Sequence, residues 1–255
     1  HLGRPQVGFR AILGFKTSWM SREVVLLGAF SGLLGYYVSL LFSDLLLSLP
    51  LPFPPFISLI LNSTYVPILE LLLAGLGVIC VLSSAMIYKD TLSDSWSQNS
   101  TFTKFLLTAG MLGTTSLLLA ILTEHFLFGT QDFINIFDQA INRLLEIVIA
   151  TSLIKMIIEF SFLLSLKEKQ NSASKQTALL MLSQLKKFTR LRFLIGFVGG
   201  IIVPMTMIAY ASSVIGSFAL LGAGLMFLYL TIAEILERYL FFTSMVLPNM
   251  PGRLR

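Results

Sequence analysis

Six long runs of apolar residues constrain the fold of this chain more than any other feature. A helix needs about 20 predominantly apolar residues to cross the roughly 30 Å hydrocarbon layer of a bilayer. The runs cover residues 22–42, 67–88, 102–122, 137–166, 193–211 and 214–247. Only 12 % of the 255 residues are charged, which is about half the usual share in soluble domains. The sequence therefore predicts an all-α fold, a polytopic bundle of six transmembrane helices forming one domain over residues 1–255.

Residues with strong local preferences mark where these helices begin and where they touch. Ser21 suits the N-cap of the first span, and Glu23 lies in its first turn, where the helix dipole favours an anion. Pro67 suits the first turn of the second span. Gly196 and Gly200 are four residues apart and predict a close contact between the fifth span and another helix.

Residues 167–192, between the fourth and fifth spans, form the most basic loop. The second half of this loop places apolar side chains opposite basic ones, which predicts an interfacial amphipathic helix leading into the fifth span. The apolar side consists of Leu179, Leu182, Leu185 and Phe188, and the basic side of Lys186, Lys187 and Arg190.

The Lys and Arg residues distinguish the two faces of the predicted bundle. Counting spans places residues 1–22, 89–104, 167–192 and 249–255 on one face, and residues 44–64, 125–136 and 212–213 on the other. Every Lys and Arg lies on the first face, apart from Arg143, Lys155 and Arg238 within the spans. The positive-inside rule places this basic face in the cytoplasm.

Ionisable residues inside membrane spans are costly and are therefore candidates for function. In the fourth span, Arg143 and Glu146 are three residues apart, and Lys155 and Glu159 are four apart. Each pair can neutralise itself on one face of its helix. Two interpretations stay open: the pairs brace the bundle, or they form a proton path.

The sixth span carries a similar set of charges. Glu234 and Arg238 are four residues apart, and Glu237 lies beside them as a carboxylate without a partner at helical spacing. The spacing predicts a buried Glu234–Arg238 pair that braces the bundle. A catalytic role for these residues is the alternative.

The N-terminal segment holds the strongest candidates for chemistry. His1 and Glu23 are separated by a short loop and are expected at the same face of the membrane. An imidazole and a carboxylate can each accept or pass a proton near neutral pH when their surroundings tune them. The pair is either a proton-accepting site for a redox carrier, or a surface histidine near a glutamate that Arg22 neutralises.

Several kinds of site are excluded by the residues available. Cys80 is the only cysteine, so neither an internal disulfide nor a cysteine-ligated cluster can form. His125 is expected on the face opposite His1, so the two histidines cannot bracket one haem. The sequence has no phosphate-binding loop, zinc motif or nucleophile elbow. We therefore expect no haem, iron–sulfur cluster, molybdenum or other metal and no catalytic residue in this chain, and electrons would leave through a partner protein.

The two ends of the chain carry its most distinctive residues. The first end has His1-Leu-Gly-Arg-Pro followed by Thr17-Ser-Trp-Met-Ser-Arg-Glu23, and the second has Glu234-Ile-Leu-Glu-Arg-Tyr-Leu-Phe-Phe242 followed by Val246-Leu-Pro-Asn-Met-Pro-Gly252. Tyr88 and Trp96 fit the same pattern. These motifs resemble the membrane-anchor subunit of the dimethyl sulfoxide reductase family, and the similarity is spread over the whole chain.

The resemblance implies a membrane anchor that works in anaerobic respiration. Such a subunit binds and oxidises menaquinol and passes the electrons to an iron–sulfur subunit, and through it to a molybdopterin catalytic subunit. By motif position, His1 and Glu23 correspond to the quinol-site histidine and glutamate of the family, and Trp19 and Arg22 border them by adjacency. The family has eight helices, so six spans imply that two N-terminal helices are absent from this sequence.

Two questions stay open at this point. One is the function class, because a secondary transporter or a proton-translocating protein could use the charges in the fourth and sixth spans. Transporters often have broken helices, and Pro204 is the one such break. A related anchor could instead move protons through Glu146, Lys155 and Glu159. The other question is orientation. Relatives face their catalytic subunits outward, whereas the basic face predicts a cytoplasmic iron–sulfur partner docked on it.

Overall fold

The computed structural model describes residues 13–42, 66–89, 98–128, 134–167, 173–209 and 217–244. All regular structure in these ranges is helical, as an apolar membrane requires of backbone groups that must satisfy one another. The helices are α2 (Trp19–Leu41), α5 (Val66–Lys89), α6 (Gln98–Phe128), α7 (Ile134–Phe160), the 3-10 helix η5 (Ser161–Lys167), α8 (Ala173–Leu182), α9 (Lys186–Phe197), the π-helical segment η6 (Val198–Ile202), α10 (Val203–Ala209) and α11 (Ser217–Thr243). The chain divides into two compact units, His1–Asp90 and Thr91–Arg255.

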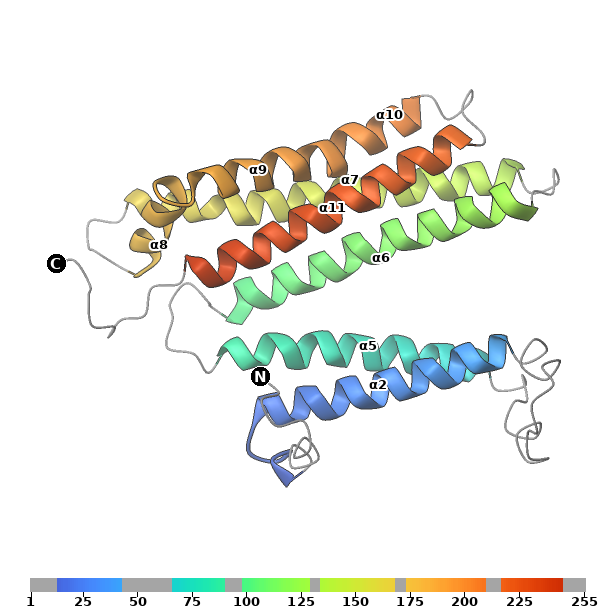
Figure 1. The fold of residues 1–255 in the computed structure, drawn as a ribbon, viewed down its shortest axis with the longest axis horizontal. Helices are drawn as coiled ribbons and strands as arrows, with labels where there is room; N and C mark the ends of the chain where they lie inside the picture. The colour runs from blue at the N-terminus through green and yellow to red at the C-terminus, as the bar shows by residue number, and fades with distance from the viewer. Residues whose placement is uncertain are drawn as a thin grey trace. The chain divides into compact units, whose positions relative to one another are not determined.

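The first unit is a pair of antiparallel helices, α2 and α5, which pack side by side (Figure 1). Two hydrogen bonds between the helices show their direction. One joins Ser84, near the end of α5, to Glu23, near the start of α2. The other joins Tyr37, near the end of α2, to Glu70, near the start of α5. A small apolar core lies near this second bond and consists of Leu40, Leu69 and Leu73.

The second unit is a bundle of four long rods, namely α6, α7, the continuous helix α9–η6–α10, and α11 (Figure 1). Successive rods run in opposite directions, and α11 packs against both α6 and α9. Neighbouring helices that alternate in direction are typical of helix bundles. The buried apolar core of this bundle consists of Met111, Leu118, Leu122, Leu145, Val148, Ala223, Met226 and Leu230.

Five helices in the described part of the chain are long and apolar enough to cross a membrane. They cover Trp19–Leu41, Val66–Tyr88, Thr101–Leu127, Lys186–Ala209 and Phe218–Thr243. The sixth expected span, 137–166, corresponds to α7 and η5. It is not among these five, because every membrane-length stretch of α7 contains several charged side chains. The crossing of the membrane by α7 stays a prediction, which its antiparallel packing against α6 supports.

The prediction for the region before the fifth span was wrong in two respects, the amphipathic helix and the start of the membrane helix. The expected amphipathic helix is interrupted, because α8 ends at Leu182 and a turn at residues 183–185 precedes α9. The membrane helix begins at Lys186 rather than at 193. The prediction placed Arg192 in the basic loop, but carboxylates on neighbouring helices compensate its charge and allow the helix to continue through it.

The expected close contact of the fifth span is confirmed. A Cβ atom at Gly200 would lie 2.5 Å from Ser152 Oγ on α7, and one at Gly199 would lie 2.6 Å from Tyr229 Cβ on α11. Both distances are far below van der Waals contact, so only glycine allows this approach at the π-helical turn. The two glycines therefore bring the α9–α10 rod against α7 and α11, beside the charged residues described next.

Candidate functional site

Glu23 lies at the start of α2 and is paired with a neutral partner. The Ser84 hydroxyl, on α5, donates a hydrogen bond to Glu23, and the distance from Oγ to Oε1 is 2.5 Å. Among the described residues Glu23 takes part in no ion pair. Its carboxylate is thus held by a hydrogen bond from a second helix, while no described cation neutralises it.

Arg22 is engaged elsewhere and does not neutralise Glu23. Its Nε and Nη2 atoms donate to the carbonyl oxygens of Phe15 and Lys16, each at 2.9 Å. Its guanidinium carbon lies 4.3 Å from the centre of the Trp19 ring, in a cation–π contact. The guanidinium therefore ties the turn before α2 to the first turn of the helix. The alternative in which Arg22 satisfies Glu23 is wrong.

The structure leaves part of the predicted quinol site undescribed. His1 lies outside the described residues. Glu23, Trp19 and Arg22 lie together in the first turns of α2, and the sequence analysis did not identify Ser84 of α5 as the residue that contacts Glu23. The sequence of an apolar helix does not indicate that one of its serines contacts another helix, because a helical serine hydroxyl usually bonds to a carbonyl oxygen of its own helix.

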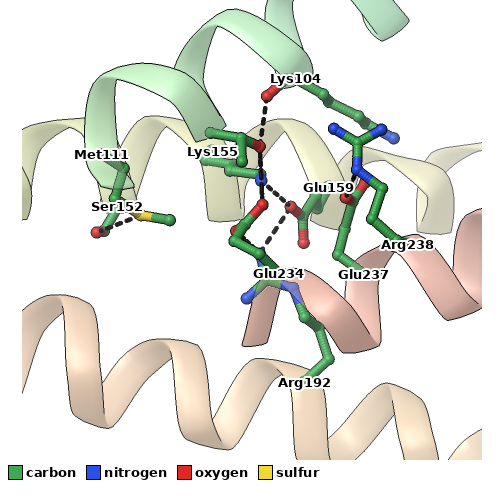
Figure 2. A network of polar contacts seen from close by, with 10 residues as sticks. Lys104, Met111, Ser152, Lys155, Glu159, Arg192, Glu234, Glu237 and Arg238 are labelled. Atoms are coloured by element: carbon green, nitrogen blue, oxygen red, sulfur yellow. Dashed lines mark hydrogen bonds and ion pairs between the residues drawn. The ribbon is translucent and has the colours of Figure 1, made fainter. Parts of the chain in front are cut away.

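A second group of ionisable residues lies inside the four-rod bundle (Figure 2). This buried ion cluster comprises Lys155 and Glu159 of α7, Arg192 of α9 and Glu234 of α11, whose side chains are 1 % to 8 % exposed. Arg192 Nη2 lies 2.8 Å from Glu159 Oε1 and 3.2 Å from Glu234 Oε1. Lys155 Nζ contacts Glu234 Oε2 and lies 3.7 Å from Glu159 Oε1. Two cations and two carboxylates therefore compensate one another across three helices.

A hydroxyl group from the fourth rod completes the cluster. Thr108 of α6 donates to Glu234, with 2.7 Å between Oγ1 and Oε2. The Lys155 ammonium donates to the same Thr108 oxygen at 2.5 Å. Gly196, one turn after Arg192, leaves the space in which the guanidinium lies, because a Cβ atom there would collide with Arg192 Nη1. All four rods thus contribute to the cluster or make room for it.

The expected ion pairs are realised only in part. Arg143 and Glu146 form their local pair at 3.0 Å, and both side chains are exposed. Arg238, however, lies 3.7 Å from Glu237 Oε2 rather than on Glu234, and its guanidinium carbon lies 3.7 Å from the centre of the Phe105 ring. The predicted Glu234–Arg238 pair is wrong, because cations on α7 and α9 reach Glu234 inside the bundle.

Arg192 is the residue of the cluster that the sequence analysis missed. It was assigned to the basic loop, yet it is 3 % exposed. Two features of the sequence could have indicated its role. Glu237 has no cation left once Lys155 is paired with Glu159 and Arg238 with Glu234, and the stretch 169–233 contains no Asp or Glu that could pair with Arg192 locally.

Among the described residues, the polar contacts of the cluster end within the bundle. Beyond Lys155, the next contact along α7 joins Ser152 Oγ to Met111 Sδ at 3.2 Å. The hydroxyl of Thr115, one turn further along α6, bonds to carbonyl oxygens of its own helix. The apolar core of the bundle follows these residues. This arrangement favours ion pairs that brace the bundle over a proton path through it.

The bracing role makes Arg192 critical for stability. Replacing it by methionine, R192M, leaves two buried carboxylates facing one ammonium, and removing one partner of a buried ion network costs about 3–5 kcal/mol. We expect a large loss of thermal stability of the detergent-solubilised protein. The exposed Arg190, on the same helix, provides the control R190M, which should change the melting temperature little. Equal melting temperatures for the two variants would contradict this account.

The comparison with known proteins extends over nearly the whole chain. The family model described as DMSO reductase anchor subunit (DmsC) matches residues 1–243, a range that covers the first unit, most of the second and both candidate groups of residues. No curated protein and no solved structure matches the chain. With five helices able to span a membrane, the chain is an integral membrane protein, and its family associates with catalytic and iron–sulfur subunits of DMSO reductase. The chain belongs to the DMSO reductase anchor subunit (DmsC) family.

Proposed function

We propose that this anchor subunit binds menaquinol beside Glu23 and delivers its electrons to the iron–sulfur subunit of the complex. The family assignment supports the complex. The observation that carries the site is the Glu23 carboxylate, which accepts a hydrogen bond from a neutral hydroxyl and has no cation partner among the described residues. A carboxylate in that state keeps the capacity to accept a proton.

The chemistry of quinol oxidation explains why such a group is needed. A quinol that becomes a quinone loses two electrons and the protons of its two hydroxyl groups. Each departing proton needs an acceptor within hydrogen-bond reach. Glu23 serves one hydroxyl in this proposal, and His1 serves the other as an imidazole that can titrate near neutral pH. The electrons pass to the iron–sulfur subunit, and the oxidised quinone returns to the membrane.

Trp19 and Arg22 shape the approach to Glu23. The indole ring lies under the guanidinium of Arg22, which is itself fixed by two backbone carbonyl oxygens. This arrangement holds a flat aromatic surface in the turn directly before Glu23. A quinol ring can stack on such a surface while one of its hydroxyl groups reaches the carboxylate. Arg22 has a positioning role here.

The iron–sulfur subunit docks on the basic face in this proposal. Lys186, Lys187 and Arg190 are exposed at the start of α9 and form no ion pair with another described residue. An acidic surface on the partner would complement them and accelerate its association. The positive-inside rule places this face in the cytoplasm.

Replacing Glu23 by glutamine tests the quinol site. E23Q keeps the size of the side chain but removes the proton acceptor, so a fluorescent hydroxyquinoline analogue of quinol should bind at least about tenfold more weakly to membranes that contain the complex. Fluorescence quenching measures this binding. The control is E70Q, at the opposite end of the same helix pair, which should bind the analogue as the native chain does. H1A provides the parallel test of His1. Tight binding that survives both E23Q and H1A would refute the site.

Topology mapping tests the orientation. A pair of reporters, one active only in the cytoplasm and one only outside it, is fused in turn after Arg255, which is expected on the basic face. We expect activity from the cytoplasmic reporter alone. Activity from the external reporter would place the basic face outside and overturn the cytoplasmic docking of the partner.

A further inference from the structure

We infer that Ser84 is a positioning residue of the quinol site, which holds one oxygen of Glu23 so that the other oxygen is directed to the quinol hydroxyl. The inference rests on the proposed function, because it assigns a role relative to the same bound quinol. It adds a residue on α5 to a site that sequence motifs place on the N-terminal segment and α2 alone.

The contact between Ser84 and Glu23 has the geometry of a strong hydrogen bond. The two residues are 61 positions apart in the sequence, so the bond joins α5 to α2. The 2.5 Å distance between Oγ and Oε1 lies in the range of hydroxyl donors to carboxylates, which are stronger than bonds between neutral groups. Ser84 has one hydroxyl proton and gives it to Oε1, which leaves Oε2 to accept a proton from a ligand.

The behaviour of neighbouring hydroxyl groups shows that this contact is specific. Ser83 is the next residue on α5, and its hydroxyl donates to the Cys80 carbonyl oxygen of its own helix at 2.8 Å. Such backbonding is the usual fate of a helical serine. Ser39, Thr114, Ser116, Thr123 and Thr151 do the same on their own helices. Ser84 instead reaches across to a carboxylate.

The flexibility of glutamate explains why a positioning residue matters. A glutamate side chain has three rotatable bonds, and fixing it costs conformational entropy. A carboxylate that is already held loses less freedom when the ligand binds, and its free oxygen keeps one direction during proton transfer. Without Ser84, the carboxylate would keep its charge but lose its orientation. The expected defect is therefore in binding and proton transfer, whereas the folding of the helix pair should persist.

The test compares S84A with the matched control S83A in membranes that contain the assembled complex. We expect S84A to weaken binding of the hydroxyquinoline analogue about tenfold, as the loss of a hydrogen bond to a charged group predicts, and to raise the KM for quinol more than it lowers kcat. S83A removes a hydroxyl one residue away and should match the native chain. S84T keeps a hydroxyl and should recover most of the binding. A reduced dye that feeds the catalytic subunit directly reports whether each variant assembles.

A double-mutant comparison separates this inference from the proposed function. In the E23Q background the further change S84A should cost nothing more, because the charge that Ser84 holds has gone. If E23Q weakens binding while S84A and S83A both bind like the native chain, Ser84 has no positioning role and the quinol site stands. If E23Q itself binds normally, Glu23 does not bind the quinol and the role of Ser84 fails with it; if H1A binds normally as well, the proposed function fails. If S84A does not assemble, S84C, which keeps the size but donates weakly, replaces it in the same comparison.

Discussion

An ion inside a bilayer needs a counter-ion, because lipid tails cannot replace the water that it loses. The second unit meets this requirement within the bundle itself. Lys155 and Arg192 each contact Glu159 and Glu234, and all four side chains are at most 8 % exposed. The contacts connect α7, α9 and α11, and Thr108 adds α6. The cluster thereby specifies which helices are neighbours and at what height, which apolar side chains alone specify weakly.

In the first unit, two carboxylates are paired with hydroxyl groups rather than with cations. Glu23 and Glu70 each receive a hydrogen bond from a hydroxyl group on the partner helix, from Ser84 and Tyr37 respectively. Such pairing orients a carboxylate without cancelling its charge. In the proposed function, the compensated charges hold the bundle together, and Glu23, which has no cation partner among the described residues, accepts a proton. Glu23 is the carboxylate that the family motif also indicates, and it lies in the second turn of α2, because the helix begins at Trp19 after Ser18 rather than after the expected N-cap Ser21.

Much of the fold could be predicted from sequence, because apolar runs long enough to cross a membrane nearly always form transmembrane helices. The helices α2, α5 and α11 correspond closely to the expected spans 22–42, 67–88 and 214–247. The errors arose where contacts with other helices determine the location or the partner of a charged residue. Arg192 was taken for a loop cation because local sequence cannot reveal carboxylates on α7 and α11. The same limit paired Glu234 with Arg238, since helical spacing accounts only for neighbours on the same helix.

The candidate site was predictable to a smaller extent. Glu23, Trp19 and Arg22 were named from the N-terminal motif, but the motif could not say what each side chain contacts. Arg22 turns away to backbone carbonyl oxygens and Trp19, and Ser84 comes from a helix more than 60 residues away in the sequence. A contact of that range depends on how α2 and α5 are aligned, and the apolar pattern of either helix leaves that alignment undetermined.

Photolabelling tests the central claim most directly, because it reports where a quinol binds without altering any residue. A menaquinone analogue that carries a photoreactive azide on its ring is bound to membranes containing the complex, illuminated, and located by mass spectrometry of peptides. The account predicts labelling of residues 13–23 and of the end of α5 around Ser84, which excess menaquinone abolishes. Competable labelling confined to the four-rod bundle, with none on α2 or α5, would contradict it.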